Sequence, residues 1–407
     1  MHIILFIMIA ALVIEQLCIN ILYSKFDFIV NTFGNLFGAI FYIGGFAAIT
    51  LSILIVYKGI KNKEFKLHKW DICFILLMIW GLFSVIFSED KQLTIIGSNY
   101  RMDGYLSYII YASFYIGART LKSEKIRLWI LRTLAFATTS LCFDFILGKS
   151  IVSIFNNQNH FAYLLTISCL LLCGLFLYES KIILKLLYLV MFGINVYTLI
   201  YVDTFGSYLA VLFGMILSVI LVCFAKQEKQ IIISSIIALF IFIAISTTVD
   251  TKTHLLRSNF SSLFTDVEKI ATDAPDADEA GSLRIMLWKL SFQYIKERPV
   301  FGYGPEGPYH AFREDGLGYD RPHNEYIQHA LFMGIPAAIF YITGLLLLFL
   351  HCIKNRKQLP SYAIISGLAV FAYCISAFFG NTMYYTSPYF FIVLGILSKP
   401  SIHVEHK

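Results

Sequence analysis

The stretch DRPHNEYIQHALFMGIP, which covers Asp320–Pro336, turns from polar to apolar within a few residues. The polar side chains of its first half include those of Arg321, His323, Asn324 and Glu325. Its second half opens an apolar run that continues to about residue 350. Because about 20 apolar residues cross the hydrocarbon core of a bilayer, the run predicts a membrane-spanning helix with a polar cluster at its mouth.

The composition of the whole chain favours the bilayer as its main solvent. The 407 residues are 58% hydrophobic and only 14% charged, whereas a soluble domain carries about 25% charged residues. The apolar runs lack the strict alternation of a membrane β-barrel. We therefore expect an all-α polytopic membrane protein with about 12 transmembrane helices. The expected spans are residues 3–22, 36–57, 71–88, 104–119, 128–147, 159–178, 182–202, 206–225, 231–247, 325–350, 361–379 and 385–398.

The lysines and arginines of the short loops predict the orientation of these spans. One alternating set of loops and the C-terminal tail carry 18 of them, and the opposite set carries four. The positive-inside rule then places both termini in the cytoplasm. Residues 1–247 hold spans one to nine, residues 248–324 form one large extracytoplasmic loop, and residues 325–407 hold spans ten to twelve and the tail. This topology predicts a multi-pass protein of the cytoplasmic membrane.

The large loop divides into three parts. The stretch TDVEKIATDAPDADEAGS, residues 265–282, is polar and mildly acidic and is expected to be mobile. The next stretch, LRIMLWKLSFQYIKERP, has helical character and mixes aromatic with basic residues, so it could lie along the membrane surface. A glycine-rich turn, VFGYGPEGPYHAF, follows it.

Several function classes find little support. The basic residues are divided among short loops rather than gathered on one face, so no nucleic-acid partner is expected. The cysteines fall in or beside apolar runs and are interpreted as small buried hydrophobic residues. GYGPEG fits G-x-G-x-x-G, but Pro305 and Pro308 stand where a dinucleotide fold would begin its helix. Asp276–Asp278 resembles a metal-binding D-x-D but lies in a polar loop, and no metal site or cofactor is predicted.

Polar clusters recur where the predicted spans end on the outer side. They are Gly97–Tyr105, Asn156–Ala162, Asp203–Ala210 and the opening stretch. Helix ends are often polar only because they touch water, and that interpretation stays open for each cluster. Arginine nevertheless suits phosphate, since its planar fork donates two parallel hydrogen bonds. Arg101 and Arg321, with a helix N-terminus near Asn324, could bind a dianionic group, and His323 could exchange a proton.

A family resemblance rests on two of these segments. GSLRIMLWKLSFQYIKERPVFGYGPEGPYHAF, followed by PHNEYIQHALFMGIP, resembles the O-antigen ligase and O-antigen polymerase superfamily. GSNYRMDGYLSY and NNQNHFAYLL also look like segments of that family. The matching positions are Arg284, Trp288, Pro299, Gly302, Gly304, His323, Asn324 and Gly334.

The resemblance implies a bacterial envelope enzyme that uses glycans carried on undecaprenyl diphosphate. Arg284 would bind the diphosphate, and His323 would activate the acceptor hydroxyl. The expected substrate-binding residues are Arg101, Arg321, Asn324, Gly302, Gly304, Asn159 and Ser207. Many family members carry an arginine beside this serine, whereas here Tyr208 follows Ser207, so Arg101 or Arg321 is expected to replace it. The partners would be the lipid-linked donor, a glycan or other envelope acceptor, and membrane lipids.

Three functions remain open at this stage. A polymerase and a ligase differ only in the acceptor, and an Ile-, Lys-, Phe- and Asn-rich chain weakly favours polymerisation of a surface polysaccharide. A lipid-carrier transporter would place ionisable residues at mid-membrane depth. Glu15 is the main candidate there, either as a structural partner of a neighbouring helix or as part of a buried site.

Overall fold

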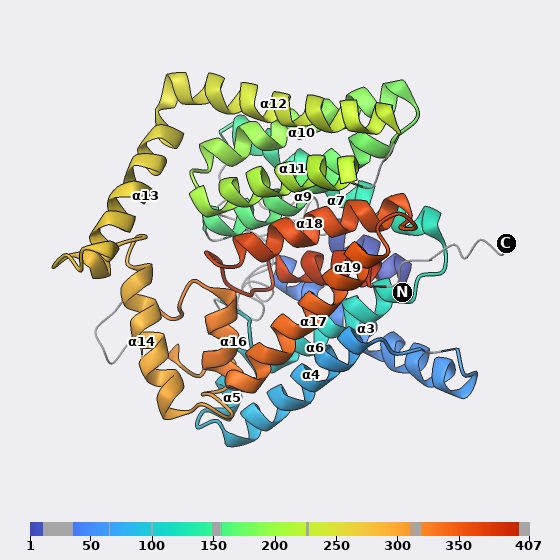
Figure 1. Cartoon of the computed structure of the whole chain (residues 1–407). Helices are drawn as coiled ribbons and strands as arrows, with labels where there is room; N and C mark the ends of the chain where they lie inside the picture. Colours follow the sequence, from blue (N-terminus) through green and yellow to red (C-terminus); the bar gives the residue numbers. More distant parts are fainter. Residues whose placement is uncertain are drawn as a thin grey trace.

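The computed structural model is helical throughout the part that it describes (Figure 1). It describes residues 1–10, 36–64, 66–98, 101–148, 155, 157–224, 228–309, 312 and 319–398. Residues 2–10 form the first helix. The later helices are α3 (Leu36–Lys61), α4 (Lys69–Phe87), α5 (Lys91–Ile96), α6 (Tyr105–Arg119), α7 (Glu124–Ile146), α9 (Gln158–Tyr178), α10 (Ile182–Tyr201), α11 (Phe205–Phe224), α12 (Lys229–Thr253), α13 (Leu255–Ala271), the 3-10 helix η1 (Ala277–Glu279), α14 (Arg284–Glu297), α16 (Glu325–Met333), α17 (Ile335–Lys354), α18 (Ser361–Ser376) and α19 (Ser387–Leu397).

Eight of the described helices are long and apolar enough to cross a membrane. They are α3 (from Gly38), α4, α7, α9, α10, α11, α12 and α17. The prediction of an all-helical protein with many membrane spans is therefore confirmed for this part of the chain. The total of twelve stays a prediction, because α6, α18 and α19 are shorter and the span predicted at 3–22 leaves the described residues. Glu15 also lies outside them.

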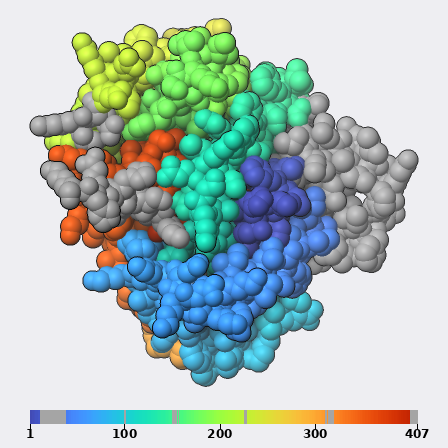
Figure 2. All heavy atoms as spheres, turned by 90° about the vertical axis from the view of Figure 1, so that its right-hand side faces the viewer, coloured from blue at the N-terminus to red at the C-terminus, as the bar shows by residue number. Residues whose placement is uncertain are grey.

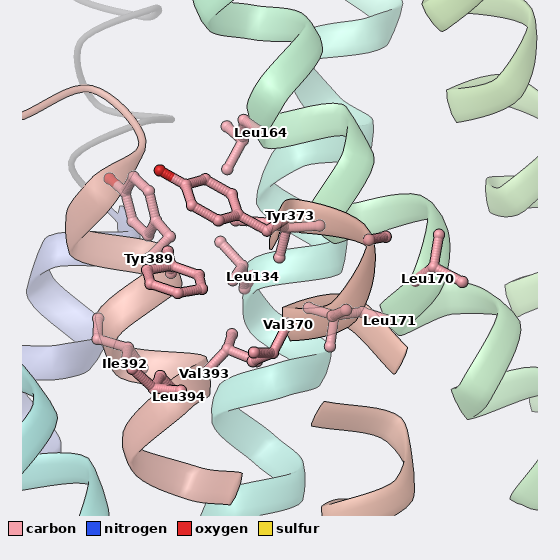
Figure 3. Close-up of a cluster of buried hydrophobic side chains, with 14 of the residues drawn as sticks. Leu134, Leu164, Leu170, Leu171, Val370, Tyr373, Tyr389, Ile392, Val393 and Leu394 are labelled. Carbon is pink, nitrogen blue, oxygen red and sulfur yellow. The ribbon is translucent and has the colours of Figure 1, made fainter. Parts of the chain in front are cut away.

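The core forms where α9 is enclosed by α7, α10, α11 and α18. Nearly all of α9 is buried inside the protein, as 94% of its most apolar stretch is covered. Figure 3 shows Leu164 and Leu171 of α9 on the side of α18, which carries Val370 and Tyr373. Lipid tails are as apolar as these side chains, so close packing rather than exclusion of water holds such helices together.

The two ends of the helix bundle carry different chemistry. At one end, Arg119 donates to the Lys66 carbonyl and to Asp71, while Arg127 donates to Tyr362. These bonds join three of the loops that carry many basic residues, and Figure 2 looks onto this end, where residues 1–10 also lie. The opposite end carries Arg101, Arg284 and His323. Which end faces the cytoplasm stays a prediction.

The span predicted at 325–350 is two helices rather than one kinked helix. α16 ends at Met333 and α17 begins at Ile335, because Gly334 between them adopts φ +86°. A Cβ atom on Gly334 would lie 2.0 Å from the Val300 carbonyl oxygen. The glycine-rich turn supports this break. The Tyr303 and Gly304 amides donate to the Leu331 and Phe332 carbonyls, at 3.1 and 2.7 Å, which α16 leaves without helical partners.

The predicted large loop is more helical than expected. The acidic stretch at 265–282, expected to be mobile, contains the last turns of α13 and the 3-10 helix η1. The helix expected after it is confirmed as α14. Its buried side chains, Leu287, Ser291 and Ile295, face the protein.

Replacing Gly334 by Ala is expected to lower the melting temperature more than replacing Gly148. Both glycines have a positive φ, which costs an L residue about 1–2 kcal/mol. Only at Gly334 does the added methyl also meet backbone, since nothing lies within 4 Å of a Cβ at Gly148. Thermal unfolding of the two variants in the same detergent measures the difference. Equal losses would mean that the glycine turn does not support the break.

Candidate functional site

His323 stands at the mouth of α16, as the sequence predicts. It directly precedes the N-cap Asn324 and adopts φ +52°, a left-handed conformation that is uncommon away from glycine. Trp288 of α14 donates its indole N–H to the Pro322 carbonyl at 3.0 Å. The turn that carries His323 is thus fastened to α14.

Arg284 begins α14, one helical turn before Trp288. Positions four apart lie on the same face of a helix, so Arg284 is presented toward the His323 turn. The three residues before it, Gly281, Ser282 and Leu283, all have positive φ. The Arg284 Nη1 donates to the Gly281 carbonyl at 2.8 Å, while its buried Nε has no partner among the described residues. No carboxylate in the described chain lies within ion-pair distance of it.

The environment of His323 keeps the imidazole neutral. Burial, followed by the positive charges of Arg284 and Arg101, lowers the pKa of His323 to about 4, although Asp320 acts in the opposite direction. At neutral pH the ring therefore has a lone pair to accept a proton. Its Nδ1 lies 3.1 Å from Nδ2 of Asn381, in the segment between α18 and α19.

Arg101 and Arg321 lie in the same region as His323, but each already has a carboxyl partner. Arg101 makes two hydrogen bonds of 2.9 Å to Asp320. Arg321 contacts Asp320 and Asp103, each at 3.1 Å. Burial raises the pKa of Asp320, but the two guanidinium groups outweigh it and hold that pKa below its usual range. Burial raises the pKa of Asp103, an effect that the charge of Arg321 opposes. Both arginines thus have a carboxyl partner, and Arg284 differs from them in having none within ion-pair distance in the described chain.

Glu306 is a buried residue that sequence reasoning did not identify. It lies in the glycine-rich turn with φ +56°, and its carboxylate accepts from the Asp103 and Ser98 amides at 2.6 and 2.9 Å. It fixes the loop that carries Arg101 and Asp103. A carboxylate between two prolines in an otherwise uncharged turn was the available signal. Asn381, Asp103 and Asp320 were also missed.

Three predicted binding residues have their polar groups engaged within the protein. Gly302 and Gly304 are buried, and their amides donate to the carbonyls of Arg298 and Phe332. The Asn324 side chain accepts from the Tyr326 and Ile327 amides. The helix thus uses these amides for its own cap, and direct anion binding at this N-terminus stays a prediction.

Asn159 and Ser207 lie on the helices that surround the site. The Asn159 side chain accepts from Thr204 at 2.9 Å and so joins α9 to the turn before α11. Ser207 is fully buried, with its hydroxyl oxygen 3.2 Å from that of Ser376 on α18. Direct substrate contact by either residue stays a prediction.

The carboxylates that resembled a metal motif are paired with lysines. Asp276 lies 2.7 Å from Lys269, and Asp278 lies 2.6 Å from Lys289. Both ion pairs are solvent-exposed. No group of three or more potential metal ligands occurs in the described ranges of the chain.

Replacing Arg321 by Met is expected to destabilise the protein by about 3–5 kcal/mol, because it leaves Asp103 buried beside an uncharged side chain. Replacing Arg101 by Met is expected to cost less, since Asp320 keeps Arg321 as its partner. The side chains are 1% and 13% exposed, respectively. Chemical or thermal unfolding of the two variants compares them. A larger loss in the Arg101 variant would contradict this pairing scheme.

Comparison with known proteins gives a match to a family model that covers this part of the chain. A family model described as O-antigen ligase matches residues 190–342. The match begins in α10, ends in the first turns of α17, and includes Arg284, Trp288 and His323. No curated protein matches the chain. The match over residues 190–342 supports a relationship of this region to the O-antigen ligase and O-antigen polymerase superfamily.

Proposed function

We propose that this protein is a membrane glycosyltransferase that moves an undecaprenyl-diphosphate-linked oligosaccharide onto a hydroxyl acceptor. One observation carries the proposal. Arg284, which has no carboxylate partner in the described chain, acts electrostatically on a neutral, half-buried histidine whose turn is fastened to the same helix. A cation for phosphate and a base for a hydroxyl are the two groups that this transfer needs.

In the proposed reaction, Arg284 holds the diphosphate of the donor and His323 faces the acceptor. The acceptor hydroxyl attacks the anomeric carbon, and its proton passes to the imidazole. The bond from that carbon to the diphosphate oxygen breaks, and polyprenyl diphosphate leaves with the electron pair. Negative charge grows on the departing oxygen, and a preorganised donor at such a position typically contributes about 2.7–4 kcal/mol. Diphosphate is already a good leaving group, so the step needs no metal.

Donor binding would strengthen the base. The cationic groups that lower the pKa of His323 are those that a diphosphate would neutralise. Bound donor therefore raises the pKa toward its ordinary value, where a general base works best near neutral pH. Asn381 would orient the ring. A half-turn of its amide presents Oδ1, which has no partner among the described residues, to the Nδ1–H and leaves Nε2 free for the acceptor.

We favour polymerisation of surface-polysaccharide repeat units, with a second lipid-linked glycan as the acceptor. Attachment of the glycan to another envelope molecule is the alternative within this chemistry. In either case the site would lie on the outer side of the cytoplasmic membrane of a bacterium, with both termini in the cytoplasm. A lipid-linked oligosaccharide transporter is less favoured, because Arg101, Arg284, Arg321 and His323 gather at one end of the bundle rather than at mid-depth.

Replacing His323 by Ala is expected to lower the transfer rate by roughly 10²–10⁴, the usual contribution of a general base. Replacing Arg284 by Ala is expected to lower it by roughly 10²–10³, the effect of losing one charge-stabilising donor. The measurement is polymer formed from a lipid-linked donor by purified protein, with immunoblots of surface polymer in cells.

Two variants serve as matched controls. His254 also has a positive φ but is exposed, and Lys289 is an exposed cation on the same helix as Arg284. Their replacement by Ala should leave the rate nearly unchanged. Normal polymer from both the His323 and Arg284 variants, at equal protein level, would refute the assignment of these residues.

The pH profile of kcat/KM tests the electrostatic coupling. With a pKa of about 4, His323 is already neutral, so the wild-type profile should be flat from about pH 5.5 upward. Replacing Arg284 by Gln removes a positive charge, raises the pKa of His323, and should move the acid limb to higher pH. Arg284→Lys keeps the charge and should leave the limb in place. An acid limb at the same pH in the Gln variant would contradict the coupling.

A further inference from the structure

Helix α13 is amphipathic, and half of its apolar face is uncovered. Apolar residues recur along it at three- and four-residue spacing, the period of one helix face. Leu263, Phe264, Val267 and Ile270 are 38, 70, 55 and 47% exposed, respectively. The opposite face carries polar side chains, those of His254, Arg257, Ser258, Ser261, Ser262, Thr265, Asp266 and Lys269.

The position of α13 relative to the membrane follows from the helix before it. α12 is long and apolar enough to cross a bilayer, and α13 follows after the single left-handed residue His254. Figure 1 shows α13 turning across the direction of α12 at the edge of the molecule. Its first apolar residues face the protein, since Leu256 is buried and the ring of Phe260 lies 4.8 Å from that of Phe205 at the start of α11. In the second half of α13, this same face is the uncovered one.

We propose that the second half of α13 inserts this face into the headgroup region of the leaflet beside the site. A helix that follows a membrane span and runs roughly perpendicular to it lies at the depth of the lipid headgroups. There its apolar face contacts acyl chains and its polar face contacts water. The helix and its flanks carry both charge signs, with Arg257 and Lys269 beside Asp266 and Glu268. The interaction is therefore with acyl chains and does not require anionic lipid.

The contact of α13 with lipid would also position Arg284. This part of the inference rests on the proposed function. Asp266, on α13, accepts from the Gly281 amide at 3.0 Å, and the Gly281 carbonyl accepts from Arg284. α13 is therefore linked to the phosphate-binding arginine through a single residue. Lipid under α13 would hold Arg284 beside His323, and loss of that lipid contact would release it.

Tryptophan fluorescence in vesicles tests the insertion without reference to activity. Phe264→Trp places the probe on the apolar face and Ser261→Trp places it on the polar face; both are compared with the parent protein and its four tryptophans. In vesicles of zwitterionic lipid brominated near the top of the acyl chains, the probe at 264 should emit at shorter wavelength and be quenched. The probe at 261 should be quenched by iodide instead. Iodide quenching at 264 without bromine quenching would overturn the proposal.

Polymer formation tests the link to Arg284. Phe264→Glu and Val267→Glu should slow transfer in zwitterionic vesicles, whereas Ser261→Glu should not. If the bromine quenching is seen but these variants keep the wild-type rate, α13 binds lipid without positioning Arg284, and the link is refuted. If His323→Ala is also fully active, the proposed function fails while the lipid contact stands.

Discussion

The structure of this end of the protein depends on one requirement: a buried charged group needs a partner of opposite charge. Removing an ion from water costs several kcal/mol, so buried ions need partners. Arg101 and Arg321 meet that requirement with the carboxyl groups of Asp320 and Asp103. Arg284 is left as the cation without a carboxylate partner in the described chain, next to a histidine whose low pKa keeps it neutral.

The break between α16 and α17 gives these groups a fixed support. The helix ends at Gly334, the glycine-rich turn satisfies the carbonyls released there, and Glu306 in that turn holds the loop of Arg101. At its other end, α16 is capped by Asn324, and the Trp288 bond joins the preceding turn to α14. The residues of this region thus do two kinds of work. Arg284 and His323 are the proposed reactive groups, while Gly302, Gly304 and Asn324 support the backbone that presents them.

The sequence predicts the helices well, because they follow from the lengths of the apolar runs. It also predicts that the polar groups gather at one end of the bundle, because successive loops alternate between the two ends. It does not predict which carboxylate each arginine contacts, because Arg101 and Arg321 each pair with an acidic residue from the other's segment of the chain. Asp103, two residues from Arg101, contacts Arg321, and Asp320, beside Arg321, also pairs with Arg101. Such choices depend on which helix ends meet. The apolar stripe of α13 was not identified because acidic residues are interspersed with it. At Gly334 the sequence predicts a kink rather than a complete break, because the apolar run continues through it.

The most direct test of the account is a cryo-EM structure of the protein in a lipid nanodisc with a non-hydrolysable polyprenyl diphosphate donor. We expect phosphate oxygens within hydrogen-bonding distance of the Arg284 guanidinium, the anomeric carbon on the side of His323, and the Arg101–Asp320 and Arg321–Asp103 pairs intact. A diphosphate that separates those pairs and binds Arg101 or Arg321, with Arg284 left free, would contradict it, as would one bound at the opposite end of the bundle.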